Sequence, residues 1–88
     1  MKVRDDYIMR PVADTWAVVP VGEAAKAFNG MITLNESGAL LWNTLKKGAS
    51  KEELVEALRA EYSVSEETAS ADTDEFLAKL KEAGALEE

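Results

Sequence analysis

Cysteine and histidine are both absent from the 88-residue sequence. Their absence excludes disulfides, thiolate nucleophiles, imidazole bases and the common ligand sets for zinc and haem. Carboxylates are then the only titrating catalysts left near neutral pH, and no motif indicates a pocket that would separate the pKa values of a catalytic pair. The sequence therefore predicts a protein that is not an enzyme and has no cofactor of its own.

Long apolar runs and positive charge are also scarce. The first residues, 1–6, lack an apolar signal core, and no run approaches the ~18 residues that a membrane span requires. We therefore expect a cytoplasmic protein that does not bind membranes. Ten Lys and Arg against seventeen Asp and Glu give a net charge of −7. Such a chain repels phosphate backbones, so nucleic acid is not an expected partner.

The first third of the chain has the composition of β structure. Residues 7–12 form a short run in which Pro11 cannot donate to a ladder, so this strand is interrupted or lies at a sheet edge. A strand at 15–21, rich in β-branched and aromatic residues, follows after a link short enough for a hairpin. A third strand is expected at 30–34, after a connection at 23–29. Three strands in series predict a small antiparallel sheet.

Helical signals dominate the rest of the chain. Asn35 offers a side-chain oxygen to a helix start, and Ser50 with Glu53 forms a capping box. Ser65 caps a last helix that stops at Gly84. The predicted helices span residues 36–47, 51–62 and 66–84.

The apolar residues of these helices recur at helical spacing and form the expected core. They are Leu41, Trp42, Leu45, Leu54, Val55, Leu58, Tyr62, Ala69, Thr73, Phe76, Leu77 and Leu80. At 47% hydrophobic and 31% charged residues, the composition fits one globular domain spanning 1–88. The sequence therefore predicts an α+β fold of order βββααα, similar in outline to a winged helix-turn-helix.

Two features with possible chemistry favour plainer interpretations. Asp72 and Asp74 look like the start of a calcium loop, but Leu77 and Ala83 stand where such a loop needs Gly and Glu. We interpret this segment as a solvated acidic helix face. A winged helix-turn-helix outline usually indicates DNA binding, yet acidic residues outnumber basic ones on both later helices.

The third predicted strand offers a sharper hypothesis. As the last strand of a meander it lies at a sheet edge, where half of its main-chain groups lack partners. Neither Lys nor Pro, the residues that usually protect such an edge, occurs at 31–33. Either the last helix or a terminus covers this edge, or the edge accepts another strand.

Residues 31–42, MITLNESGALLW, resemble the "LNesg..iw" stretch of the PqqD-like family. Residues 48–54 look like its "G.s.eEl" join, 58–62 like its "L...Y", and 72–86 like its "Dv..FL..L...GlL" ending. Thr73 and Ala85 depart from the aliphatic residues usual there, and the connection before the third strand is longer and more helix-prone. The match covers nearly the whole chain in order and spacing.

This resemblance implies a peptide-binding chaperone. Such a domain captures the leader of a ribosomally made precursor peptide as a strand antiparallel to the third strand, in the cleft beside the last helix. It then delivers the peptide to a modifying enzyme, commonly a radical SAM protein with iron–sulfur clusters. The clusters would belong to that partner, because this chain has no Cys to ligate one.

The expected peptide site combines main-chain pairing with side-chain selection. Its residues are Gly30, Met31, Ile32, Thr33 and Leu34 on the strand, and Thr68, Asp72, Glu75 and Lys79 on the last helix. Each of the four helix residues is equally consistent with plain solvated surface. Two rival functions remain open, a DNA-binding transcriptional regulator of winged-helix type and a structural subunit that stabilises an enzyme.

Overall fold

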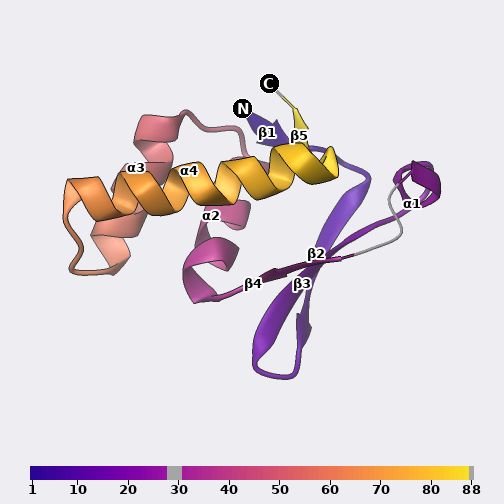
Figure 1. The fold of residues 1–88 in the computed structure, drawn as a ribbon, viewed down its shortest axis with the longest axis horizontal. Helices are drawn as coiled ribbons and strands as arrows, with labels where there is room; N and C mark the ends of the chain where they lie inside the picture. Colours follow the sequence, from indigo (N-terminus) through magenta and orange to yellow (C-terminus); the bar gives the residue numbers. More distant parts are fainter. Residues whose placement is uncertain (28–30, 88) are drawn as a thin grey trace.

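The computed structural model describes residues 1–27 and 31–87. In chain order the elements are β1 (Lys2–Val3), β2 (Tyr7–Val12), β3 (Thr15–Pro20), α1 (Ala24–Ala27), β4 (Ile32–Leu34), α2 (Glu36–Lys46), α3 (Lys51–Glu61), α4 (Glu66–Ala83) and β5 (Leu86–Glu87). The long α4 lies across the molecule, with α2 and α3 at one end and the β2–β3 hairpin projecting away from it (Figure 1).

Strands β2, β3 and β4 form an antiparallel sheet in that order. The hairpin between β2 and β3 pairs Val12 with Thr15, which leaves a two-residue turn. The first turn residue, Ala13, adopts a φ of 55°. Tight hairpin turns require a positive φ here, although residues with a side chain rarely adopt one. The predicted three-stranded antiparallel sheet, with its third strand at an edge, is therefore confirmed, and Pro11 lies on the other edge strand.

The helices begin where the sequence predicts, because the caps are local signals. The Asn35 side chain accepts a hydrogen bond from the Gly38 N–H at 2.9 Å. Ser50 and Glu53 form the reciprocal capping box. Gly84 ends α4 in the left-handed conformation, with a φ of 75°. Helices α2 and α3 each end one residue earlier than predicted, at Lys46 and Glu61.

The core lies between the inner face of the sheet and the three long helices. Trp42, at 1% exposure, is the largest fully buried side chain of this core. Burial of so large a side chain contributes strongly to the hydrophobic stabilisation of a small domain. The predicted helix stripes are buried as expected, apart from Tyr62 and Leu77, which are partly exposed. The sheet contributes Val18 and Leu34. The predicted α+β architecture is confirmed.

Three short elements were not predicted. The connection after β3 contains α1, a single helical turn, which the order βββααα omits. Strands β1 and β5 form a separate two-stranded sheet, pairing Lys2 with Glu87 and Val3 with Leu86. Strands of two residues are too short to produce an alternating pattern, and their pairing joins opposite ends of the chain.

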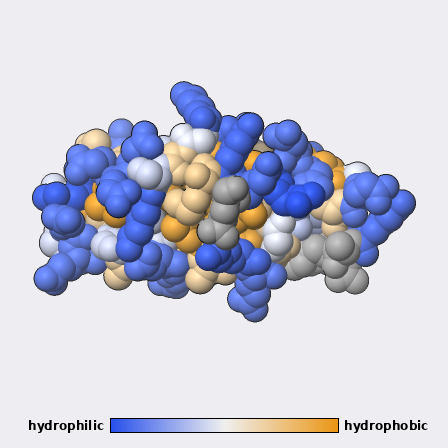
Figure 2. Space-filling view, turned by 90° about the horizontal axis from the view of Figure 1, so that it is seen from above, coloured by the Kyte–Doolittle hydropathy of each residue, from blue (hydrophilic) through white to orange (hydrophobic). Residues whose placement is uncertain are grey.

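The outer surface reflects the composition. Figure 2, which views the molecule from above, shows hydrophilic residues over most of that face, with apolar residues between them. This agrees with the 31% of charged residues in the sequence. Of the helices formed by residues 1–27 and 31–87, none has the length and apolar character needed to cross a bilayer.

Candidate functional site

One hydrogen bond beside the hairpin fixes which main-chain groups of the sheet are paired. The N–H of Val21 donates to the carbonyl oxygen of Asp6 at 2.8 Å. In an antiparallel ladder, alternate residues direct their N–H and C=O groups to opposite sides. The odd-numbered residues of β3 therefore bond to β2, and the even-numbered ones, Trp16 and Val18, face β4.

The same alternation determines the open side of β4. Leu34 lies opposite Trp16 and Ile32 opposite Val18, so Ile32 and Leu34 direct their main-chain groups to β3. Met31 and Thr33 direct theirs to the other side. In the part of the chain that the structure describes, no strand pairs with β4 there. Met31 is also 59% exposed to solvent.

A groove runs along this open side, between β4 and α4. It consists of two adjoining hollows of about 380 Å³ and 280 Å³, which share Thr33 and Lys79 in their walls. Leu41 and Phe76, both buried core residues, lie at its base. Among the described residues that line it, Lys79 is the one basic side chain. The groove therefore offers main-chain groups on one wall and charged side chains on the other.

The structure brings most of the predicted site residues together. Those that line the groove are Met31, Ile32, Thr33, Leu34, Asp72, Glu75 and Lys79. Thr68 lines neither hollow. It belongs to the first turn of α4, where its N–H donates a hydrogen bond to the capping Ser65 hydroxyl at 3.1 Å. Gly30 lies outside the described residues.

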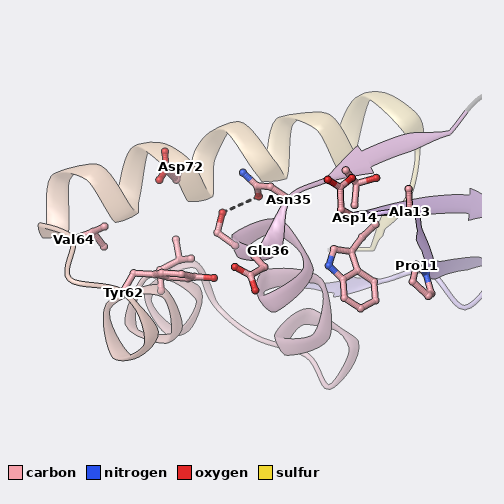
Figure 3. Close-up of a pocket in the computed structure, with 12 residues that line it drawn as sticks. Pro11, Ala13, Asp14, Asn35, Glu36, Tyr62, Val64 and Asp72 are labelled. Carbon is pink, nitrogen blue, oxygen red and sulfur yellow. Dashed lines mark hydrogen bonds between the residues drawn. The ribbon is translucent and has the colours of Figure 1, made fainter.

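A third hollow, of about 780 Å³, was not anticipated from the sequence. It lies at the end of the groove, where the hairpin turn, the start of α2 and the connection from α3 to α4 meet (Figure 3). Four residues line both this hollow and the groove: Thr15, Asn35, Ser37 and Asp72. Its walls come from segments distant in the sequence, so no local pattern could have revealed it. We call it the end pocket.

The described residues contain no group of three or more acidic side chains placed to hold a metal ion. A shifted pKa occurs away from the groove, where Arg4 hydrogen bonds to Asp6 at 3.1 Å. The hydrogen bond and charge of the guanidinium lower the pKa of the Asp6 carboxyl below its ordinary value. This ion pair belongs to the turn between β1 and β2.

The fold and the groove define a class of small α+β domain, in which a three-stranded sheet leaves one strand edge open beside the last helix. Residues 15–86 match the family of coenzyme PQQ synthesis protein D (PqqD), and the chain belongs to that family. No curated protein matches the chain.

Two solved structures are similar to the whole domain. One is TbiB1 in complex with the TbiA(beta) leader peptide. It is 29% identical in sequence, with a TM-score of 0.78, and the match covers 99% of this chain and 95% of that one. The other is a lasso peptide synthetase B1 complexed with the leader peptide, 23% identical with a TM-score of 0.73, covering 96% and 93%. The second likeness supports the fold.

Proposed function

We propose that this protein binds the leader segment of a ribosomally made precursor peptide and presents it to a modifying enzyme. The leader adds as a strand antiparallel to β4, in the groove beside α4. The observation that carries the proposal is the open edge of β4 next to a groove, in a member of the PqqD family. A structure 29% identical to this chain holds a leader peptide.

Main-chain pairing supplies affinity that is independent of sequence, and side chains in the groove supply selection. The N–H and C=O groups of Met31 and Thr33 are placed to bond the added strand. Selection falls to Asp72, Glu75 and Lys79 on α4. An affinity of roughly micromolar, about 8 kcal/mol, is typical of a short segment in a preformed groove.

The chain itself performs no chemistry in this proposal. With neither Cys nor His in the sequence, it has no ligands for an iron–sulfur cluster and neither a thiolate nucleophile nor an imidazole base. The chemistry belongs to the partner enzyme, for which a radical SAM protein is the hypothesis. The net charge of −7 disfavours the rival function of a DNA-binding regulator.

The test is a titration of the ¹⁵N-labelled chain with the leader of a precursor peptide from a neighbouring open reading frame. We expect amide shifts concentrated at Met31 and Thr33 and at residues 72–79 of α4. Thr33→Pro removes an outward N–H while leaving the bonds to β3, so it should abolish most binding and keep the fold. Thr33→Val is the matched control, because it keeps both the N–H and the β-branched shape.

Shifts confined to other surfaces, or equal binding by both Thr33 variants, would contradict strand addition. Binding to duplex DNA at physiological salt, without binding to the leader, would favour the regulator instead.

A further inference from the structure

The end pocket is larger than either part of the groove and has walls of a different kind. Its apolar lining includes Leu58, which is buried, and the rings of Trp16 and Tyr62, which are partly exposed. Because the end pocket and the groove share Asn35 and Asp72, a chain that lies along β4 and continues past Leu34 enters it directly.

Three carboxylates surround this apolar lining, and they come from three separate elements. Asp14 is in the hairpin turn, Glu36 begins α2, and Asp72 lies on α4. In the view of Figure 3, the Glu36 side chain lies between Tyr62 and Asp14. The residues described as lining the pocket include no Lys or Arg.

Some acidic side chains elsewhere on the surface contact a basic residue. Lys26 contacts Glu23 at 3.3 Å, and Lys51 contacts Asp74 at 2.9 Å. Within the described residues, Asp14, Glu36 and Asp72 have no such partner within 4.0 Å. The end pocket therefore combines aromatic rings with negative charge that the protein does not itself neutralise.

We propose that the end pocket receives a lysine or arginine side chain of the bound leader, from a residue on the N-terminal side of the segment that pairs with β4. The inference rests on the proposed function. Long basic side chains fit such a site because their apolar stems pack on aromatic rings while their charged heads reach carboxylates. The position on the N-terminal side follows from the direction of the strands. Because β4 runs from Ile32 toward Asn35, a leader antiparallel to it has its N-terminal end beside Asn35, where the end pocket lies.

The test uses an mRNA-display library of random linear peptides, selected on the immobilised wild-type chain. Peptides that shift the amides of Met31 and Thr33 are kept as edge binders. We expect these to share a Lys or Arg at a fixed position before their pairing segment. In one such peptide, replacement of that residue by norleucine should weaken binding to the wild type about tenfold.

A pair of double variants then locates the interaction. In Asp14→Asn/Glu36→Gln the same replacement in the peptide should weaken binding by less than about twofold, because two of the three carboxylates that the basic residue complements are then neutral. The control, Asp5→Asn/Glu67→Gln, makes the same change of charge at exposed positions outside the end pocket. The control should retain the tenfold loss. The urea midpoint of each variant verifies folding, and the two single variants serve if a double variant is unfolded.

The outcomes separate the two proposals. Edge binders that favour aromatic residues at this position, or favour no residue, overturn the inference and leave strand addition intact. If norleucine replacement weakens peptide binding equally on the wild type, the double variant and the control, the basic residue acts through overall charge. That result also overturns the inference. A library that yields no edge binders overturns the proposed function itself.

Discussion

The two outer strands of one sheet, β2 and β4, present their free edges in opposite ways. Outward main-chain groups on β2 belong to Tyr7, Met9 and Pro11, by the same alternation that applies to β4. The Tyr7 N–H already donates to the carbonyl oxygen of Arg4 at 3.3 Å, and Pro11 has no N–H. Only Met9 keeps an outward donor on this strand within the described structure.

The edge of β4 has none of these protections. Both Met31 and Thr33 carry an outward N–H, and neither Pro nor Lys occurs between Met31 and Leu34. Edge strands left in this condition tend to pair with other chains. One edge of the sheet is therefore protected against pairing while the other, beside the groove, is left open, as the proposed strand addition requires.

The largest expected effect comes from the packing that supports both edges. Trp42→Ala should lower the free energy of unfolding by about 3–5 kcal/mol, because it removes a large side chain and leaves a cavity. Trp42 is 1% exposed and lies at the centre of the core. Urea unfolding measures the loss, with Val12→Ala on the exposed side of β2 as the control. A melting temperature within about a degree of wild type would contradict the placement of α2.

Amide-to-ester replacement distinguishes the two sides of β4. At Ile32 it removes a bond to β3, so the free energy of unfolding should fall by about 1 kcal/mol. At Thr33 it removes an outward donor, so leader affinity should fall by about 1 kcal/mol while folding changes less. Chemical denaturation and calorimetric titration provide the two readouts. Equal effects of both esters on folding, with none on leader affinity, would show that β4 is paired on both sides.

The acidic residues beside β4 make the rate of leader association sensitive to salt. Asp72, Glu75 and Glu82 lie along the groove beside β4, with Lys79 among them. A leader that carries Lys or Arg should associate several-fold more slowly as ionic strength rises from low to physiological, because screening weakens the attraction. Stopped-flow association rates test this, and a neutral leader analogue is the control. Identical rates at both salts would remove electrostatic steering and leave strand addition unaffected.

The smallest expected effect concerns the turn between β1 and β2, which leads into the protected edge strand β2. The hydrogen bond from Arg4 lowers the pKa of Asp6 in the folded state, so this pair stabilises the fold above the ordinary pKa of Asp. Its contribution is lost as pH falls through the lowered value. Asp6→Asn should remove this part of the pH dependence. Urea midpoints of wild type and variant should therefore differ at neutral pH and converge in acid; a constant difference would exclude the linkage.

Local signals account for what the sequence predicted well. Asn35, Ser50 and Ser65 cap helices through bonds to residues three positions on, so their roles are visible in short stretches. The edge position of β4 followed from strand order. The pairing direction of Met31 and Thr33 did not, because it depends on the register between β3 and β4.

The features that escaped prediction depend on distant contacts. The end pocket joins the hairpin turn to the α3–α4 connection, and β1 pairs with β5 across the full length of the chain. Thr68 was predicted from its spacing on the helix. Its spacing from Asp72 puts both on one helix face, yet the groove ends before it, because the sheet edge is shorter than α4.

The pairing of β1 with β5 has a consequence for tethering. It holds both ends of the domain beside the C-terminal end of α4 (Figure 1), where the Arg4 N–H donates to the Ala85 carbonyl oxygen at 2.9 Å. An antiparallel leader would leave the groove at this same corner, near Met31 and Ala83. A leader fused ahead of the domain therefore needs only a short linker. One fused behind it must pass back along the groove, a span no longer than the roughly 27 Å of the 18-residue α4, and a flexible Gly/Ser linker of about 25 residues has an r.m.s. end-to-end distance of that size.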